Sequence, residues 1–490
     1  MIKKLPETYQ SVISSNNGMW MYLSNLSKGR QFTPRSWLYE NLSPDKILDD
    51  WVTRLDVLRN GNTFEKKVFQ FDTSQMEKWG PQGGIAPISD LMKEVVEPTF
   101  EAHSPAPAFR TKNWIEAIDA TRNELVTHFG IFGLRPASYK RVVDDMRARD
   151  TLESNSGWPD FTRRNKPEVI ANAVAAAEDG TWMEYPAIAL FRNYNLKTRL
   201  VWMFPMSANL VEGSFFQPLQ SQIIKRRLPY YAPWLGFSSV RALITRAYAQ
   251  GKFIQASDFS KTDEHFRIAA TRQVFEVLRR LIAKPYNQAL WVSLEYMHNI
   301  PLIIGLNEML VGEHGVSSGS NWTNFVETVF DQIFANYVRS ATNHSGLYAI
   351  GDDMAWVSDR YDDAFSKELE HLGKEVGQVV KAEKTTNDPD SVKTLQRLFQ
   401  RGYSRPDGEL RGVYSTIRAL KSSVFPERFH RPQDWSSDMF CARQYMILEN
   451  CVDHPLFEEF VKFVVQGQKD LIPFAKKSGS ELDRIQRESK

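Results

Sequence analysis

The stretch "LYAIGDDMAWVSD", residues 347–359, places two adjacent carboxylates, Asp352 and Asp353, between two short apolar runs. Each run is long enough for a β-strand, and a Gly-Asp-Asp connection is typical of the turn that closes a hairpin. Two acids at one turn repel each other unless a positive charge lies between them. Because hard cations such as Mg²⁺ bind carboxylate oxygens, the stretch predicts either a metal-binding hairpin or an ordinary acidic turn.

The composition of the chain limits the classes of protein to which it belongs. Its 490 residues are enough for two to four subdomains with a substantial core. Two cysteines, Cys441 and Cys451, are too few for a disulfide framework or a four-cysteine zinc site. The net charge of +2 argues against a basic coat protein but is compatible with an internal basic channel. Because no apolar run is long enough to span a bilayer, we expect a soluble cytosolic protein without a membrane partner.

Hydrophobic periodicity predicts a mixed α+β chain. Apolar residues recur at the helical period in "TRNELVTHFGIF" (121–132), "VIANAVAAAEDG" (169–180), "TRQVFEVLRRLIAK" (271–284) and "NWTNFVETVFDQIFANYVRS" (321–340). Strand-like runs flank the Gly-Asp-Asp turn and occur in "GKFIQASDF" (251–259) and "LKTRLVWMF" (196–204). The last stretch, "KKSGSELDRIQRESK" (476–490), is polar, and its composition favours disorder.

A third acid follows one of these predicted strands. Asp258 falls where the apolar run that begins at Phe253 ends, and Asp263 follows five residues later. Beside the hairpin, Asp258 would complete a cradle of three carboxylates, as two metal ions about 3.5–4 Å apart require, and such a cradle suits phosphoryl transfer. Strand-end acids are also common helix N-caps, so the alternative is a cap for a helix that begins near Glu264.

A hydroxyl-rich loop precedes one predicted helix, in "GVSSGSNWTNFVETVF" (315–330). We expect the helix to open at about residues 322–324. A Ser-Gly loop at a helix N-terminus allows close backbone approach and directs N–H groups at an anion or a sugar hydroxyl. The alternative is a Ser-rich turn that caps the helix.

Basic side chains alternate with apolar ones in "FRNYNLKTRLVWMFP" (191–205), which contains Arg192, Lys197 and Arg199. In a strand, this alternation brings basic side chains to one face. Fixed cations on such a face favour binding of a triphosphate and the charge of a leaving pyrophosphate. A solvated strand face is the alternative interpretation.

The order of these elements resembles that of the motifs in viral RNA-dependent RNA polymerases, which have a right-hand fold of fingers, palm and thumb. A set of such motifs in one order is far more specific than any one alone. The matching residues are Arg199 for motif F, Asp258 and Asp263 for motif A, Ser318, Gly319, Thr323 and Asn324 for motif B, Gly351, Asp352 and Asp353 for motif C, and Lys384 in "GQVVKAEKTT" (377–386) for motif D, with "LQRLFQRGY" (395–403) for motif E.

Within this family the chain most resembles the polymerases of picobirnaviruses, small double-stranded RNA viruses, with partitivirus polymerases as near relatives. The resemblance spans roughly residues 192–430. Many positive-strand polymerases have an Asn four residues after the motif B Thr, where this chain has Glu327, so Asn324 is its substitute. The stretches that carry the resemblance are "RLVWMFPMSANLVEGSFFQPL" (199–219), "SGSNWTN" (318–324) and "GVYSTIRALKSSVFPERFH" (412–430).

The resemblance implies a role for each matched side chain. Asp258 and Asp352 would hold two Mg²⁺ ions, for which Mn²⁺ is an alternative, with Asp353 in a supporting metal role. Lys384 would act as general acid on the leaving group; its alternative is a surface lysine. The implied nucleotide-binding residues are Lys197 and Arg199 for the triphosphate, and Asp263, Ser318, Gly319, Thr323 and Asn324 for the loop and ribose contacts. The stretch "IIKRRLPYY", with Lys225, Arg226 and Arg227, predicts either a template-channel patch or a solvated loop.

The family resemblance also implies the organisation of the chain and its partners. We expect an N-terminal extension over 1–100 that bridges fingers and thumb, fingers over 101–250, a palm with a fingers insertion over 251–400, and a thumb with a C-terminal tail over 401–490. The palm would have a small antiparallel sheet backed by helices. The expected partners are RNA template and product, ribonucleoside triphosphates and a viral capsid protein, in the virion interior and the host cytoplasm.

Three other functions compete with this interpretation. A reverse transcriptase shares the palm, but its hairpin usually reads Tyr-x-Asp-Asp, whereas Gly351 precedes the acids here. A glycoside hydrolase needs its two carboxylates about 5–10 Å apart across a cleft rather than adjacent on one turn. A non-catalytic RNA-binding or capsid protein would bind RNA without depending on Asp352 or Asp353.

Overall fold

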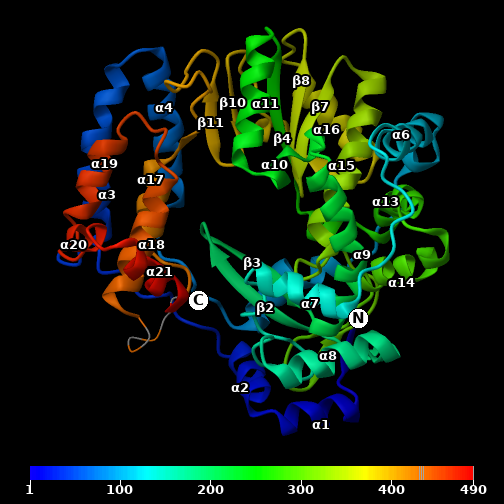
Figure 1. The fold of residues 1–490 in the computed structure, drawn as a ribbon. Coiled ribbons are helices and arrows are strands. Elements are labelled where there is room, and N and C mark those ends of the chain that lie inside the picture. Colours follow the sequence, from blue (N-terminus) through cyan, green and yellow to red (C-terminus); the bar gives the residue numbers. More distant parts are fainter. Residues whose placement is uncertain (430, 432, 434, 489–490) are drawn as a thin grey trace. The chain divides into compact units, whose positions relative to one another are not determined.

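The computed structural model describes residues 1–488 apart from 430, 432 and 434, and the chain divides into two compact units (Figure 1). The first unit comprises residues 1–29, 86–191 and 200–389, and the second comprises 30–85, 192–199 and 390–490. Each unit is therefore assembled from segments that are far apart in the sequence. The first hundred residues contribute to both units.

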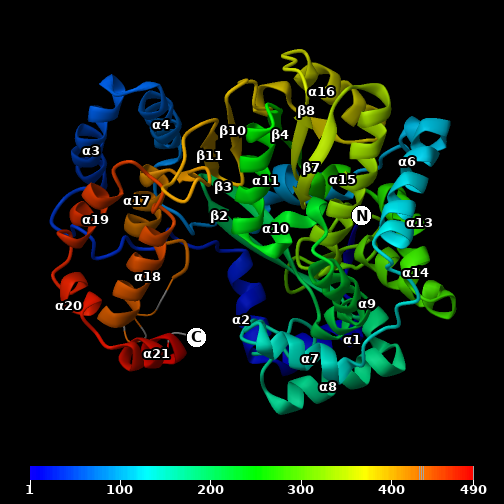
Figure 2. The same cartoon turned by 45° about the horizontal axis from the view of Figure 1, so that its top comes forward.

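The sheet that carries the Gly-Asp-Asp turn lies in the first unit and has four antiparallel strands in the order β7-β8-β4-β9. Figure 2 shows its strands β7, β8 and β4. Their bounds are β7 Ser345–Ile350, β8 Asp353–Ser358, β4 Phe253–Ser260 and β9 Val379–Val380. The predicted hairpin is confirmed, because β7 and β8 pair on either side of residues 351–352. The expectation that Asp258 ends its strand is wrong: β4 continues to Ser260, because Phe259 and Ser260 pair with β9.

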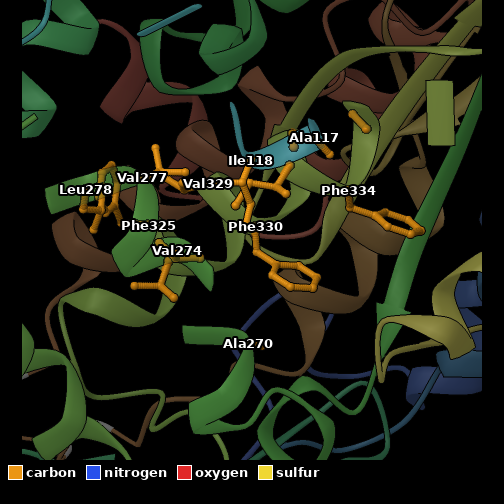
Figure 3. Close-up of a cluster of buried hydrophobic side chains, with 14 of the residues drawn as sticks. Ala117, Ile118, Ala270, Val274, Val277, Leu278, Phe325, Val329, Phe330 and Phe334 are labelled. Atoms are coloured by element: carbon orange, nitrogen blue, oxygen red, sulfur yellow. The ribbon is translucent and has the colours of Figure 1, made fainter. Parts of the chain in front are cut away.

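Helices with apolar faces pack beneath this sheet. Helix α15, Trp322–Ala341, contributes Phe325, Val329 and Phe330, which meet apolar residues of α6, Lys112–Asn123, and α13, Ile268–Leu281 (Figure 3). Helices α6 and α13 each bury one stripe of apolar residues at three- and four-residue steps, whereas α15 is buried on nearly every side from Phe325 to Ala335. The predicted helical periods of 271–284 and 321–340 are thereby confirmed, whereas in the predicted stretch 121–132 the α-helix ends at Asn123 and one wider turn, Glu124–His128, follows. The mixed α+β class is confirmed as well.

The rest of the first unit surrounds this core. A second sheet has the strand order β1-β6-β5-β2-β3, with the tip of the β2–β3 hairpin, residues 192–199, assigned to the second unit. Its strands are β1 Ile2–Lys4, β2 Ala187–Tyr194, β3 Lys197–Met203, β5 Leu302–Ile303 and β6 Glu308–Leu310. The remaining helices are α1 Glu7–Ser15, α2 Asn17–Leu26, α5 Ile88–Leu91, α7 Tyr139–Ala148, α8 Pro167–Asp179, α9 Met206–Lys225, α10 Ala232–Leu235, α11 Phe237–Ala249, α12 Thr262–His265, α14 Asn287–Met297 and α16 Phe365–Glu375.

The second unit has its own apolar core, in which segments from both ends of the chain meet. Trp51 of α3 is fully buried there against Phe460 and Phe463 of α19. The expectation of disorder at the C-terminus is wrong for residues 479–488, which form a helix because Ile485 is buried in this core. The elements are α3 Pro44–Leu55, α4 Thr63–Thr73, β10 Ser391–Thr394, β11 Arg397–Gln400, β12 Val413–Tyr414, α17 Thr416–Val424, α18 Ser437–Glu449, α19 Phe457–Val465, α20 Leu471–Ala475 and α21 Gly479–Glu488.

Within the described part of the chain, no helix combines the length and the apolar character that crossing a membrane requires. The two cysteines, Cys441 and Cys451, are both buried and reduced.

Candidate active site

The Gly-Asp-Asp turn is seated on the N-terminal half of α15. Gly351 has a φ of +57°, a left-handed conformation that glycine adopts without strain. Its N–H donates a 2.9 Å hydrogen bond to Thr328 Oγ1, and that hydroxyl donates to the Asn324 carbonyl at 2.7 Å. A Cβ at position 351 would lie 3.0 Å from Asn324 Nδ2, so a larger residue would displace the Asn324 side chain in addition to straining the backbone. The helix therefore fixes where the two acids are presented.

The antiparallel register brings the third acid to this turn. Asp258 of β4 lies directly opposite Asp353 of β8, and the Phe259 N–H donates to the Asp352 carbonyl at 3.0 Å. Side chains of directly opposed residues lie on the same face of a sheet, with Cβ atoms about 4.5–5.5 Å apart. The alternative in which Asp258 caps a helix is wrong, because the N-cap of α12 is Lys261. The predicted cluster of Asp258, Asp352 and Asp353 is thus assembled at one point of the sheet.

Negative charge accumulates around these acids. Desolvation by the surrounding protein atoms raises the pKa of the Asp353 carboxyl to about 7, and the negative charges of Asp352 and Asp258 add to the effect. Solvent nevertheless reaches this side chain. Burial raises the pKa of Glu327 well above its ordinary value, with Asp352, Asp263 and Asp353 adding to the effect and a hydrogen bond from Thr262 opposing it. Asp263, on α12, is therefore close enough to Glu327 for their charges to interact.

Asp331 is an acid at this site that the sequence interpretation did not identify. It is fully buried on α15, and neither of its carboxylate oxygens has a hydrogen-bond partner. Burial and the charges of Glu327, Asp352 and Asp353 raise its pKa well above its ordinary value. The signal was present in the sequence, because Glu327 and Asp331 are four residues apart and share the face of α15 that carries Asn324 and Thr328.

The chemistry of these side chains fits a divalent metal ion. Among the described residues, no three carboxylate, histidine or cysteine side chains already form a closed ligand set. The acids at the turn nevertheless offer hard oxygen donors from two adjacent strands, and their mutual repulsion opposes full ionisation unless a cation is bound. A divalent cation would relieve that repulsion.

Lys384 reaches this group of acids. Its Nζ lies 3.7 Å from Asp258 Oδ2 and donates a 3.5 Å hydrogen bond to Ser260 Oγ. The residue follows β9, and the pairing of β9 with the end of β4 brings it there. A partly exposed ammonium at this position can supply a proton to a nearby oxygen.

The Ser-Gly loop precedes α15, which opens at Trp322 as expected. Ser318 is exposed, and its hydroxyl contacts β3 weakly, accepting from the Trp202 N–H at 3.4 Å. The Thr323 hydroxyl donates to the Ser317 carbonyl at 2.5 Å, so in this structure it holds the loop. Asn324 is exposed beside the Gly-Asp-Asp turn. Gly319 lies so close to the Trp202 carbonyl that a Cβ would come within 1.6 Å of it.

The predicted triphosphate-binding residues belong to the second unit. Lys197 and Arg199 are exposed on β3 at alternate positions, as expected for one strand face. Arg192 does not join them as a free cation, because it forms two hydrogen bonds with Glu427, at 2.7 and 2.8 Å.

The basic stretch at residues 225–227 begins at the last residue of α9 in the first unit. Lys225 borders a cavity of about 600 Å³ that three arginines also line, Arg135, Arg141 and Arg149. The stretch therefore lies beside a basic recess of the first unit.

Comparison with known proteins gives a consistent assignment. The model of the family described as viral RNA-dependent RNA polymerase matches residues 195–411. The potential RNA-dependent RNA polymerase of Human picobirnavirus (strain Human/Thailand/Hy005102/-) is 27% identical over 484 residues, which cover 93% of this chain and 86% of the relative. The RNA-directed RNA polymerase of Cryptosporidium parvum virus 1 is 24% identical over 165 residues, 32% of this chain and 31% of the relative.

Solved structures show the same fold. The crystal structure of the RNA-dependent RNA polymerase of a human picobirnavirus matches with a TM-score of 0.83 and 24% identity, covering 99% of this chain and 94% of that one. Its insertion loop deletion mutant gives a TM-score of 0.84 at 24% identity, covering 99% and 97%. The right-hand polymerase fold and the resemblance expected from the motifs are therefore confirmed. The chain is therefore similar to the viral RNA-dependent RNA polymerases, which are RNA-directed nucleotidyltransferases, and among them to the picobirnavirus enzymes.

Proposed function

We propose that this polymerase replicates and transcribes the genome of a small double-stranded RNA virus by a two-metal mechanism. Its family implies an RNA template, ribonucleoside triphosphates and a divalent metal ion. The observation that carries the proposal is the pairing of Asp258 with Asp353 next to Asp352, on a turn held by α15. Three carboxylates from two adjacent strands are the donor set that two-metal nucleotidyl transfer requires.

The three acids are proposed to have different roles in metal binding. Asp258 and Asp352 would hold two Mg²⁺ ions, or Mn²⁺, with Asp353 supporting them. Bound there, such ions lower the pKa of the attacking 3′-hydroxyl and stabilise the charge on the triphosphate and leaving pyrophosphate. Gly351 keeps the acids in place through its hydrogen bond to Thr328, so that no reorganisation is needed when the substrate arrives.

Lys384 is the proposed general acid. Its Nζ is close to the Asp258 carboxylate, which is expected to hold the ammonium at the reacting end of the triphosphate. Donation of a proton from Nζ to the pyrophosphate oxygen would assist its departure.

The incoming nucleotide is proposed to contact the remaining matched residues. Lys197 and Arg199 would bind the triphosphate, whose charge favours fixed cations. Ribose recognition would involve Asp263, Ser318, Gly319, Thr323 and Asn324, which lie on α12, the Ser-Gly loop and the start of α15. A hydroxyl-rich contact of this kind can separate ribonucleotides from deoxyribonucleotides.

The proposal also includes how the enzyme contacts its template, where it acts and which protein is its partner. Template contacts would be mainly to the RNA backbone, because a copying enzyme accepts every sequence. We place the enzyme in the virion interior and the host cytoplasm, with a capsid protein as partner, by analogy with the double-stranded RNA viruses that it resembles.

Incorporation of labelled nucleotides on a single-stranded RNA template with Mg²⁺ tests the proposal. The parent should incorporate ribonucleotides, and Asp352→Asn should reduce incorporation at least about a thousandfold, because it removes a metal-binding charge while keeping the side-chain shape. Asp359→Asn is the matched control, since Asp359 is exposed at the far end of β8, 3.8 Å from Lys252. Equal activity of parent and Asp352→Asn would overturn the assignment, and a preference for deoxyribonucleotides would indicate a reverse transcriptase instead.

A further inference from the structure

We propose that Glu212 is a positioning residue for nucleotide binding, because it holds the Ser-Gly loop from behind in the conformation that the incoming ribonucleotide needs. This inference rests on the nucleotide-binding role proposed for that loop. Glu212 lies on α9, is only 2% exposed and matches none of the polymerase motifs found in the sequence.

The Glu212 carboxylate joins the end of the loop to α9. It accepts a hydrogen bond from the Ser320 hydroxyl and a 3.0 Å hydrogen bond from the Asn321 N–H. Asn209, one turn earlier on α9, donates through Nδ2 to Glu212 at 2.8 Å and to the Gly319 carbonyl at 3.3 Å. Three successive loop residues, 319 to 321, are therefore fixed by two side chains of one helix.

A partly buried arginine completes the network. Arg164 donates through Nη2 to Asn209 Oδ1 at 2.8 Å and through Nε to the Asn155 carbonyl at 3.0 Å. Its charge attracts Glu212 and offsets part of the effect by which burial raises the pKa of that carboxyl to about 7. Every hydrogen-bonding neighbour of the Glu212 carboxylate donates to it, so the network is built around an acceptor.

The network fixes the loop on one side and leaves the other side open. Behind the loop, Gly319 packs directly on the Trp202 carbonyl, whereas Ser318 is exposed to solvent. Ser320 also accepts a 3.1 Å hydrogen bond from the Trp322 N–H, which links Glu212 to the first turn of α15. That helix carries Thr323 and Asn324 and seats the Gly-Asp-Asp turn through Thr328. Glu212 can thus act on the substrate site without touching substrate.

Substitutions of Glu212 should affect KM more than kcat. Glu212→Ala leaves Ser320, Asn321 and Asn209 without their shared acceptor, so the loop would lose its fixed position. We expect KM for the ribonucleotide to rise about tenfold or more, while kcat changes less than about threefold. Glu212→Gln should stay within about threefold of the parent in KM, because its carbonyl oxygen still accepts and its amide can donate to the rotatable Ser320 hydroxyl.

Matched variants separate positioning from folding. Glu295→Ala is the control, because Glu295 is exposed on α14 of the same unit, and thermal unfolding is measured for every variant. If Glu212→Ala does not fold, Ser320→Ala and Glu212→Asp replace it, since each weakens the contact to the loop while keeping most of the buried network. Both should raise KM.

Three results would count against this inference in different ways. An active parent whose foldable Glu212 and Ser320 variants keep the parental KM would overturn this inference alone. If Glu212→Gln folds but does not restore activity, and if kcat falls and KM rises in parallel with a loss of thermal stability, the residue has a merely structural role. A parent that incorporates no ribonucleotide would overturn the proposed function and this inference together.

Discussion

Two fully buried aspartates, one in each unit, have opposite pKa shifts because their hydrogen-bond partners differ. Asp72 of α4 accepts hydrogen bonds from the hydroxyls of Ser415 and Thr416, both at 2.6 Å, from His454 Nε2 at 2.8 Å and from the Ile417 N–H at 3.0 Å. Burial alone would raise its pKa, but the hydrogen bond and charge of His454, with those hydroxyls, bring the pKa below its ordinary value. Its charge is therefore compensated by the protein itself.

Asp331 is as buried as Asp72, yet neither carboxylate oxygen has a hydrogen-bond partner, and three further acids raise its pKa. In the second unit the protein stabilises the ionised carboxylate of Asp72, whereas beneath the Gly-Asp-Asp turn burial and the neighbouring acids oppose ionisation of Asp331. Because a buried carboxyl without hydrogen-bond partners destabilises a fold, its retention next to Asp352 and Asp353 suggests that its ionisation is compensated from outside the chain. A cation at the turn would provide that compensation.

The largest effect on stability should come from Asp72→Ala. Removing the carboxylate leaves two hydroxyls, the N–H groups of Thr416 and Ile417 and the His454 ring without their buried acceptor. We expect a loss of about 3–5 kcal/mol in the free energy of unfolding of the second unit. Denaturant unfolding measures it, with Asp49→Ala on an exposed position of α3 as control. A loss no greater than in the control would contradict the view that Asp72 is compensated by its neighbours.

The sequence could predict the site's centre because its signals are local. Gly351 with two acids between alternating apolar runs indicates the turn, and the order of motifs leads to Asp258 and Lys384. The partners of Asp72 could not be read in this way, since Ser415 is 343 residues away and only the folded second unit brings them together. Glu212 and Arg164 look like ordinary charged residues of their segments, and the burial of Glu212 and its link to Arg164 through Asn209 depend on how α9 packs behind the Ser-Gly loop.

The two regions should also respond to pH with opposite signs. Asp72 has a lowered pKa, so its stabilising contribution is present above the ordinary aspartate pKa of about 3.9 and is lost as the pH falls through the folded value. Asp353 has a pKa raised to about 7, so without metal its contribution is present at low pH and is lost as the pH rises through about 7.

Thermal unfolding in a chelator tests the Asp353 half of this contrast. Between pH 5 and pH 8 the thermal midpoint of the parent should fall relative to that of Asp353→Asn, because only the parent gains a negative charge at position 353 in this range. Adding Mg²⁺ at pH 8 should raise the midpoint of the parent more than that of the variant. If the two proteins show parallel pH profiles, the charges at the turn do not repel each other as the geometry indicates.

The smallest effect on stability should come from Asp331→Asn, in direct contrast to Asp72→Ala. The carboxylate has no hydrogen bond to lose, and the amide has nearly the same shape, so the free energy of unfolding should change by less than about 1 kcal/mol. The Mg²⁺ concentration for half-maximal activity should nevertheless rise about two- to fivefold, because a cation near Asp352 and Asp353 favours ionisation of Asp331, whereas the amide cannot ionise. A titration of activity with Mg²⁺ measures the shift. If Asp331→Asn instead destabilises the first unit by several kcal/mol without moving the Mg²⁺ midpoint, Asp331 is a structural acid like Asp72. The contrast between the two regions would then fail.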